Sequence, residues 1–195
     1  MNIAVLASHA GTTLQAVLDA CAAGRIAGRV VLVISNNAAA GALERARRSS
    51  VPVLHLSART HPDPAALDRA IRDALLASAA EVVLLAGYMK RLGPATLAAF
   101  AGRVINTHPA LLPKFGGRGM YGEHVHRAVL AAGESESGAS IHRVDAQYDT
   151  GPVIAQVTVA VAPQDTPETL AARVQQAERE LLVRVLADMA GSTSA

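Results

Sequence analysis

Short apolar runs alternate along the chain with segments whose apolar residues recur every three or four positions. The runs lie at residues 3–6, 30–34, 51–56, 82–85 and 104–105. Helical spacing between them predicts helices around residues 14–21, 42–48 and 67–75, and another that begins at Pro94. Fully apolar strands that alternate with helices are typical of a mainly parallel sheet with helices on both faces. This part of the chain therefore predicts a Rossmann-like α/β fold.

The later part of the chain has a different pattern. Residues 139–144 and 153–161 are strand candidates with a short connection, which predicts an antiparallel pair. A long helix is expected from Thr166-Pro167, because one helical face carries a stripe of apolar residues, namely Leu170, Val174, Ala177, Leu181 and Val185. We expect a single domain over residues 1–190 and a disordered tail over residues 191–195.

Composition narrows the classes of function. The chain is 51% hydrophobic, but only 3% of its residues are aromatic, so platforms for stacking nucleic-acid bases are scarce. A net charge of +2 gives no electrostatic footprint for nucleic acid. The single cysteine excludes an intrachain disulfide. No stretch reaches the roughly 18 apolar residues of a membrane span. We expect a cytoplasmic protein with small-molecule substrates and no nucleic-acid or membrane partner.

Ligands bind open parallel sheets at the carboxyl ends of the strands. After the first strand comes a turn that contains Gly11, Thr12 and Thr13 and opens a helix. Backbone N–H groups at such a turn suit a phosphate, although an ordinary helix start would look the same. The glycine fingerprint of dinucleotide sites and the P-loop lysine are both absent from this turn.

Polar residues also follow the strand at 104–105. Asn106 and His108 share one face of an extended segment, since side chains alternate along a strand. An amide donor beside an imidazole suits acyl transfer, although a structural histidine would also fit here. Asp149, before a Gly-Pro turn, is either a turn former or a carboxylate that orients His108 and favours its charged form. No serine or cysteine nucleophile motif accompanies them.

Taken in order, these motifs resemble the folate-dependent phosphoribosylglycinamide formyltransferase family. The match covers nearly the whole chain, and its most specific part is the run of residues 106–113, Asn-Thr-His-Pro-Ala-Leu-Leu-Pro. Further matching strings are residues 1–6 with the Gly11 turn, Ser35-Asn36, residues 85–89, residues 149–154, and Arg173-Val174-Gln175 with Glu178.

The resemblance implies transfer of the formyl group of 10-formyltetrahydrofolate to the amine of glycinamide ribonucleotide, by direct attack and without a metal. It gives catalytic roles to Asn106, His108 and Asp149. The residues it implies for the ribonucleotide are Gly11, Thr12, Thr13, Gly87, Pro109, His124 and Glu178. Those it implies for the folate are Met89, Lys90, Arg91, Leu92, Val144 and Asp145. A monomer or a homodimer is expected.

The chain departs from the family pattern in three places. Thr12-Thr13 stands where Ser-Asn is more usual, and Lys90 stands where arginine is common. The segment Phe115–Glu123 is longer than in many relatives and is either a lid over the site or a flexible surface loop. His124 and His126 follow it, but their spacing does not suit a zinc site.

Other functions remain open. Formyltetrahydrofolate deformylase uses the same three catalytic residue types but hydrolyses the formyl group, and it carries an additional N-terminal domain that we do not expect in this chain. A formyltransferase for another amine is also possible on these motifs. An alternative of a different class is a non-catalytic nucleotide-binding module, because a fold alone does not specify an activity.

Overall fold

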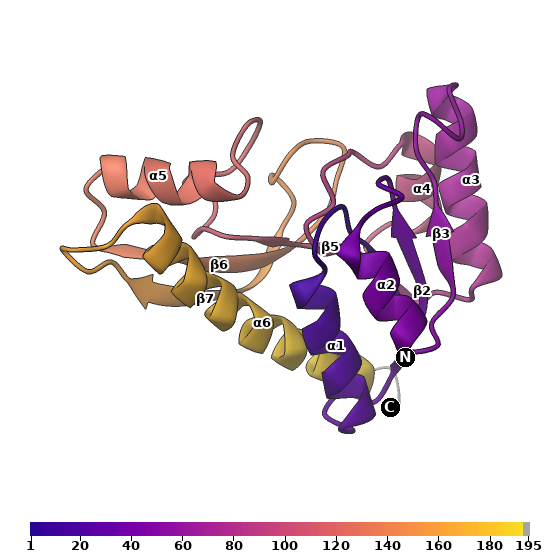
Figure 1. Ribbon diagram of the computed structural model, residues 1–195, viewed down its shortest axis with the longest axis horizontal. Helices are drawn as coiled ribbons and strands as arrows, with labels where there is room; N and C mark the ends of the chain where they lie inside the picture. Colours follow the sequence, from indigo (N-terminus) through magenta and orange to yellow (C-terminus); the bar gives the residue numbers. More distant parts are fainter. Residues whose placement is uncertain (193–195) are drawn as a thin grey trace. The chain divides into compact units, whose positions relative to one another are not determined.

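The computed structural model describes residues 1–192, which form an α/β arrangement (Figure 1). Its strands are β1 (Asn2–Leu6), β2 (Arg29–Ser35), β3 (Val53–His55), β4 (Val82–Leu85), β5 (Val104–His108), β6 (Glu136–Arg143) and β7 (Val153–Ala160). Its helices are α1 (Thr12–Ala22), α2 (Gly41–Arg48), α3 (Pro64–Ala77), α4 (Pro94–Ala99), α5 (Glu123–Ala131) and α6 (Pro167–Ser192).

The strands form one sheet in the order β3-β2-β1-β4-β5-β6-β7. β1 pairs in parallel with β2 and β4, and β2 pairs in parallel with β3. β6 and β7 pair antiparallel, with Ala139 opposite Val157. The expected fold class, a mainly parallel α/β sheet with an antiparallel C-terminal portion, is confirmed.

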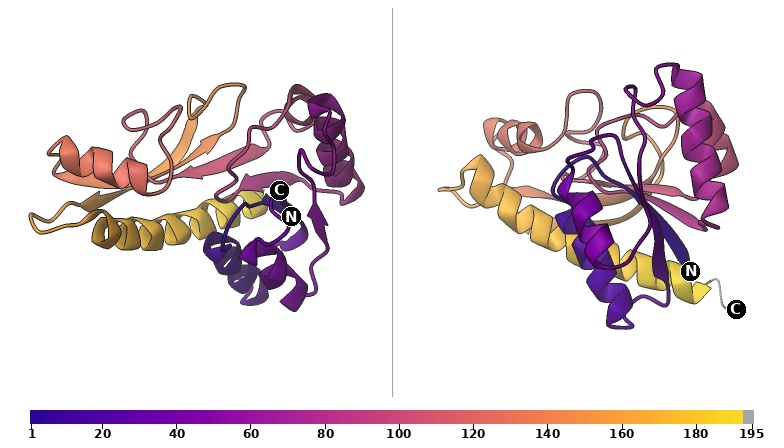
Figure 2. Two further views of the ribbon diagram at one scale, coloured as in Figure 1. Left: turned by 45° about the horizontal axis from the view of Figure 1, so that its top comes forward. Right: turned by 45° about the vertical axis from the view of Figure 1, so that its right-hand side comes forward.

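The chain divides into two compact units. The first comprises Met1–Ile105 and the residues from Leu186 onward. In this unit α1 and α2 lie on one face of the strands, and α3 and α4 lie on the other (Figures 1 and 2). The central strands are therefore covered on both sides, which explains why all four residues of β4 are buried.

The second unit comprises Asn106–Val185. Its hydrophobic core joins α5, β6 and α6 through Val129, Ala139, Leu170 and Val174. Gly138 in β6 has no room for a side chain, because a Cβ there would lie 2.0 Å from the carbonyl oxygen of Val157. At this position the backbone of β6 therefore packs directly against the backbone of β7.

Several boundaries differ from the sequence expectations, and one helix was not expected. β5 continues through His108, so Asn106 and His108 lie within the strand rather than after it. Helix α5 was not expected, because its polar residues and the glycine-rich segment before it hide the spacing of Val125 and Val129. α6 continues to Ser192, so the first two residues of the expected tail are helical. Residues 193–195 lie outside the described part, and the domain limits 1–190 stay a prediction.

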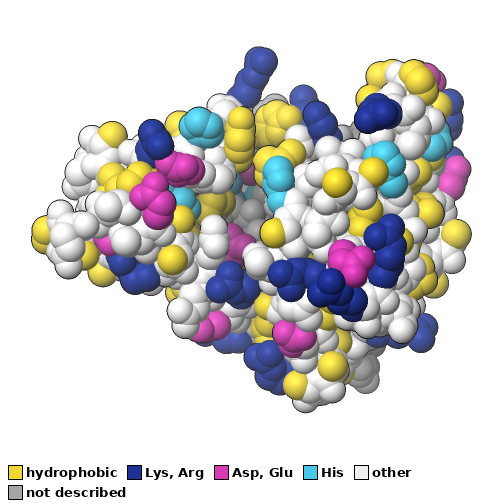
Figure 3. Space-filling model, in the orientation of Figure 1, with side chains coloured by type: hydrophobic (Ala, Val, Ile, Leu, Met, Phe, Trp, Pro, Cys, Tyr) yellow, Lys and Arg dark blue, Asp and Glu magenta, His cyan; other side chains and the backbone are white. Residues whose placement is uncertain are grey.

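Charged side chains on the face shown in Figure 3 are of mixed sign, with acidic groups among the Lys and Arg side chains rather than one continuous basic patch. Arg48 pairs with Glu44 along α2, and Arg127 pairs with Glu123 along α5. Such exposed pairs contribute little to stability, about 0–1 kcal/mol each.

Asp68 of α3 caps a different helix. The N-cap residue of α4, Gly93, offers no side chain, and Asp68 accepts hydrogen bonds from the backbone N–H groups of Ala95 (2.7 Å) and Thr96 (3.0 Å) instead. The Thr96 hydroxyl also donates to this carboxylate at 2.6 Å. A Cβ at Gly93 would lie 2.3 Å from Asp68 Cγ, so the glycine makes room for the carboxylate. The cap therefore ties α4 to α3.

We expect Asp68→Ala to lower the free energy of unfolding by about 2–3 kcal/mol, because it removes a cap and leaves buried donors without an acceptor. Denaturant titration measures this loss. Asp63→Ala is the matched control, since Asp63 caps its own helix α3 at the surface and its removal should cost only about 1 kcal/mol. A smaller loss at Asp68 than at Asp63 would contradict the assigned role.

Candidate active site

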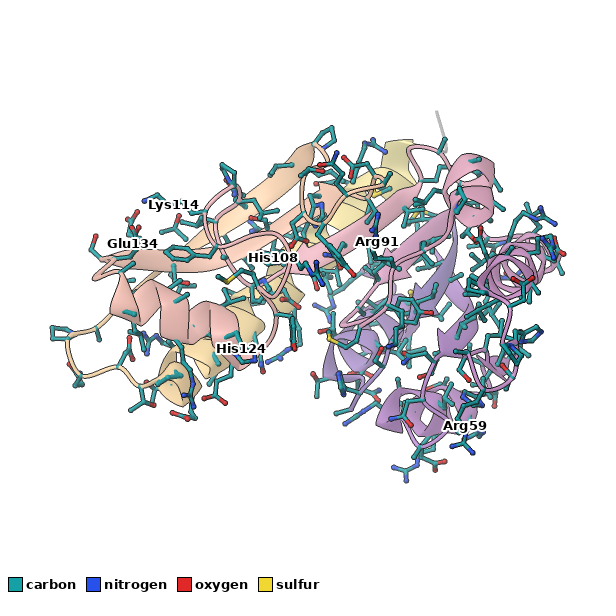
Figure 4. All side chains as sticks on the ribbon, turned by 90° about the horizontal axis from the view of Figure 1, so that it is seen from above. Arg59, Arg91, His108, Lys114, His124 and Glu134 are labelled. Atoms are coloured by element: carbon teal, nitrogen blue, oxygen red, sulfur yellow. The ribbon has the colours of Figure 1, made fainter. Side chains whose placement is uncertain are left out.

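Asn106 and His108 lie on β5 at its carboxyl end, in the second unit. The side chain of His108 is labelled in Figure 4. His108 is only 3% exposed, whereas Asn106 is half-buried. Their placement on alternate positions of one strand confirms that they share a face.

The two ring nitrogens of His108 have different partners. Nε2 lies 2.8 Å from the backbone carbonyl oxygen of Phe115. A carbonyl only accepts hydrogen bonds, so Nε2 carries the proton in the neutral ring. Nδ1 lies 3.6 Å from Oδ2 of Asp149. The bare nitrogen of a neutral His108 therefore faces a carboxylate and is placed to receive a proton.

Burial lowers the pKa of His108, and this effect outweighs the Asp149 carboxylate and the Phe115 carbonyl, which both raise it. The nearby His142 ring adds a smaller lowering effect on the pKa. Asp149 does favour the charged form of His108, as expected, but it does not keep the ring charged at neutral pH. The resting site consequently pairs a neutral imidazole with a carboxylate.

Asp149 occupies a left-handed backbone conformation with φ 57°, and its side chain is 11% exposed. Oδ2 accepts a hydrogen bond from the backbone N–H of Gly117 at 2.9 Å. Burial alone would raise the pKa of Asp149, but hydrogen bonding, including that from the Gly117 N–H, and the attraction of the His142 and His108 rings in their charged forms lower it below the ordinary value. Asp149 is therefore ionised in the resting site.

Gly116 packs closely beside this carboxylate. A Cβ at that position would lie 2.5 Å from Cδ2 of Leu112 and 3.3 Å from Cβ of Asp149. Phe115, just before it, adopts the left-handed region with φ 54°. The backbone of residues 115–117 thus fits closely around both His108 and Asp149.

His142 completes the cluster and was missed in the sequence. Its Nδ1 lies 2.9 Å from the carbonyl oxygen of Arg143, so a neutral ring presents Nε2 as an acceptor. Nε2 lies 3.0 Å from Nδ2 of Asn106 and 3.5 Å from Oδ1 of Asp149. The only signal in the sequence is that Ser140 and His142 interrupt a buried strand at a spacing of two.

The arrangement brings the three expected catalytic residues into one cluster. The Asn106 amide donates one N–H to His142 and keeps a second N–H for another acceptor. An amide N–H and an imidazole N–H on one strand face can stabilise a developing oxyanion, while Asp149 stabilises an imidazolium. The geometry suits general acid–base and oxyanion chemistry.

The residues expected at the ribonucleotide are divided between the two units. In the first unit, Gly11 caps α1 in a left-handed conformation with φ 74°, followed by Thr12 and Thr13. A Cβ at Gly11 would lie 2.6 Å from the backbone Cα of Ala42, so this turn packs directly on α2. Gly87 follows β4 and is also left-handed, with φ 68°.

In the second unit, the expected ribonucleotide residues are Pro109, His124 and Glu178. Pro109 follows β5 directly. His124 lies at the beginning of α5 (Figure 4), where the exposed ring of Tyr121 meets it edge-on at 5.3 Å. Glu178 is only 7% exposed on α6, on the same side as the buried residues Val174 and Leu181, as expected from helical spacing.

The residues expected at the folate are likewise divided. Met89, Lys90 and Arg91 are exposed in the first unit, and Leu92 is buried. In the second unit, Asp145 accepts hydrogen bonds from the backbone N–H of Gln147 and the Thr150 hydroxyl, at 2.8 and 2.9 Å. Val144 lies between β6 and Asp145 and is partly buried. The structure thus gives Asp145 a role in shaping the loop between β6 and β7, which contains Asp149.

The glycine-rich segment Phe115–Glu123 is not purely a loop, because Glu123 is the first residue of α5. Gly117, Gly119 and Gly122 all have positive φ angles, which side chains disfavour. Just before the segment, Lys114 pairs with Glu134 at 2.9 Å, and Figure 4 shows the two side chains together. Whether the segment acts as a lid stays a prediction.

Within residues 1–192, no cluster of three or more His, Cys, Asp or Glu side chains is arranged to hold a metal ion. His126 is buried in α5. None of the helices in the described part of the chain is both long and apolar enough to cross a membrane.

Comparisons with known proteins agree with this geometry. The family model described as "Formyl transferase" matches residues 1–186. The phosphoribosylglycinamide formyltransferase of Mycobacterium tuberculosis is 43% identical over 97% of this chain and 85% of its own length. The Escherichia coli protein of that name is 41% identical over 95% of this chain and 85% of its own length. The chain spans only 64% of a chloroplastic relative from Arabidopsis thaliana.

Among solved structures, glycinamide ribonucleotide transformylase 1 from Symbiobacterium toebii superposes with a TM-score of 0.92. The two sequences are 41% identical, and the match covers 98% of this chain and 88% of the other. Both the sequence and the fold therefore identify the family suggested by the motifs. The chain belongs to the formyl transferase family.

Proposed function

We propose that this chain transfers the formyl group of 10-formyltetrahydrofolate to the primary amine of glycinamide ribonucleotide in purine biosynthesis. The observation that carries the proposal is the buried cluster of Asn106, His108 and Asp149 on and beside β5. Relatives that share 41–43% of the sequence bear the name phosphoribosylglycinamide formyltransferase. A formyltransferase activity with the folate as formyl donor accounts for both.

In the proposed reaction, the amine nitrogen attacks the formyl carbon and the carbonyl electrons move onto oxygen. The free N–H of Asn106 and the protonated ring of His108 stabilise the resulting tetrahedral oxyanion. For Nε2 of His108 to donate to this oxygen, it must give up the Phe115 carbonyl as its partner. The bond from carbon to the folate nitrogen then breaks.

One proton must leave the attacking amine and one must reach the departing folate nitrogen. Nδ1 of His108 can take up a proton because Asp149 stabilises the charged ring at 3.6 Å. Asp149, ionised in the resting site, would help to relay the proton through water. The amine attacks directly, so no covalent acyl-enzyme forms.

The binding roles follow the family resemblance. We propose that Gly11, Thr12 and Thr13 hold the phosphate and that Gly87, Pro109, His124 and Glu178 contact the rest of the ribonucleotide. Met89, Lys90, Arg91, Leu92, Val144 and Asp145 would line the folate site. The turn at Gly11 suits the phosphate role because its N-cap has no side chain that competes for the helix N–H groups.

A cytoplasmic location and assembly as a monomer or homodimer are also proposed. The plant relatives are named chloroplastic, so location differs within the family. Fractionation of cells that express the chain would test the location, and light scattering of the purified protein would test the assembly. A membrane-bound pool or a larger oligomer would reject these two proposals.

The function is tested by incubating the purified protein with 10-formyltetrahydrofolate in the presence and absence of glycinamide ribonucleotide. We expect deformylation of the folate only when the amine is present, with stoichiometric formation of the formylated product. Release of formate without the amine would identify a deformylase instead. Absence of any turnover would favour the non-catalytic binding module.

We expect Asn106→Ala to lower kcat by about 10²–10³, because removal of one oxyanion donor typically has an effect of this size. Steady-state kinetics with both substrates measure the loss, and circular dichroism checks the fold. A folded variant with near-normal turnover would show that the Asn106 amide does not contact the oxyanion.

Asp149→Asn should lower kcat more than it raises KM, because a carboxylate that supports an imidazolium acts mainly in the transition state. The pKa of His108 is already lowered by burial, and loss of the carboxylate lowers it further. The population with protonated His108 exists below this pKa and disappears as the pH rises through it. The corresponding limb of the pH–rate profile should therefore move to lower pH.

The pH–rate profile of kcat checks this expectation, with Glu134→Gln as the control. Glu134 is a carboxylate that pairs with Lys114 at the surface, so its substitution should leave the profile unchanged. An effect of Asp149→Asn on KM alone, with no movement of the limb, would assign Asp149 to substrate binding.

Glu178→Gln should weaken ribonucleotide binding by about 1.5–3 kcal/mol, the usual contribution of a hydrogen bond to a charged group. KM for the ribonucleotide should rise while KM for the folate stays nearly constant. Glu180→Gln on the exposed side of the same helix is the control. Equal effects on both substrates, or lost thermal stability with unaltered KM, would make Glu178 structural.

A further inference from the structure

Ser8 lies directly after β1 and is only 2% exposed. Its backbone N–H donates to the carbonyl oxygen of Gly87 at 3.1 Å, and its own carbonyl oxygen accepts from Nδ2 of Asn37 at 3.4 Å. Its hydroxyl donates to Oδ1 of Asn36 at 2.5 Å and accepts from the backbone N–H of Met89 at 2.8 Å. Both polar groups of the backbone and the hydroxyl are therefore engaged.

These contacts lie where the strand order of the sheet reverses. In the sheet, β1 lies between β2 and β4, and Leu6 of β1 is opposite Leu85 of β4. The chain segments after β1, β2 and β4 all reach Ser8, and all belong to the first unit. Parallel sheets bind ligands at such a reversal point.

The Ser35-Asn36 pair, for which the proposed mechanism has no use, belongs to this junction. Asn36 accepts the hydrogen bond that the Ser8 hydroxyl donates. The lone pairs of the Ser8 oxygen then point toward the Met89 N–H, which donates to it. Ser35 accepts from the backbone N–H of Asn37 at 3.1 Å. Asn36 thus orients the hydroxyl, whereas Ser35 shapes only the local turn.

Residues Met89–Leu92 are fixed at both ends by such contacts. Ser8 binds the backbone N–H of Met89, and Asp68 binds the backbone N–H of Ala95 in the first turn of α4, three residues after Leu92. Between these points the side chains of Met89, Lys90 and Arg91 are exposed. The backbone of the segment is therefore constrained at both ends, while these three side chains lie at the surface.

We propose that Ser8 is a positioning residue for the folate substrate and that it acts through the Met89 backbone, with Asn36 orienting its hydroxyl. This inference rests on the proposed function, because the segment 89–92 is assigned to the folate there. Ser8 also begins the turn that leads to Gly11, so one hydroxyl connects the segment proposed for the folate with the turn proposed for the phosphate. It contacts neither substrate itself.

The test compares variants of the full chain in formyl transfer. Ser8→Ala should raise KM for 10-formyltetrahydrofolate about five- to tenfold, the size expected for one lost hydrogen bond, with kcat within about twofold. Asn36→Ala should act in the same direction. Asn36→Asp should restore the wild-type value, because a carboxylate oxygen still accepts from the Ser8 hydroxyl.

Ser35→Ala is the matched control, since it removes a neighbouring buried hydroxyl that does not contact Met89. It should leave KM for the folate unchanged. An equal rise of KM in Ser35→Ala and Ser8→Ala would show that any buried hydroxyl in this turn has the same effect, and it would overturn the proposal. Failure of Asn36→Asp to restore binding would also overturn it.

Amide hydrogen exchange of Met89 separates this inference from the proposed function. The Met89 N–H should exchange faster in Ser8→Ala and in Asn36→Ala than in the wild type, whether or not the protein transfers formyl groups. Unchanged exchange in both variants would reject the hydrogen-bond link. Faster exchange with unaltered folate KM would reject the positioning role, whereas a wild-type protein without transfer activity would reject the proposed function alone.

Discussion

The close approach of a neutral imidazole and a carboxylate in a buried site constrains the second unit more than any other interaction. A buried carboxylate without hydrogen bonds would be protonated, since burial disfavours its charge. The hydrogen bond from the Gly117 N–H opposes this for Asp149, whose pKa lies below the ordinary value. His108 depends in turn on Asp149, because burial alone would lower its pKa further.

This requirement explains the unusual backbone around the site. Phe115 and Asp149 adopt left-handed conformations that cost non-glycine residues on the order of 1–3 kcal/mol. In return, the Phe115 carbonyl and the Gly117 N–H reach the two catalytic side chains. Gly116 between them leaves room for Leu112 and Asp149. The strained backbone at Phe115 and Asp149 thus supports the electrostatics of the site. Packing in the rest of the unit must offset the cost of this strain.

Much of the fold could be predicted from the sequence because aliphatic residues recur with clear periods in β4, α1 and α6. The shared face of Asn106 and His108 follows from strand alternation alone. The proximity of Asp149 does not follow from any spacing rule, since 40 residues lie between it and His108. The pairing of Asp149 with His108 was implied by the resemblance to a family, and the structure places the two side chains together.

Other features depend on tertiary contacts that leave little trace in the sequence. His142 looks like a core residue of a buried strand, and only its neighbours reveal that it contacts Asn106. Asp68 looks like an ordinary helix residue, although it caps the helix that begins at Pro94. The effect of Asp149 on His108 follows from charge alone, but the burial that lowers the His108 pKa is set by tertiary packing, which a single sequence does not give.

The Ser8 contact with Met89 has a consequence for changes of substrate range. Its hydroxyl holds a main-chain N–H and makes no demand on the identity of the residue that carries it. The side chain at position 89 can therefore be exchanged without loss of the local frame, provided that the residue is not proline, which has no N–H to donate. A directed library that varies positions 89–91 while retaining Ser8 and Asn36 would sample new ligand contacts on an unchanged backbone.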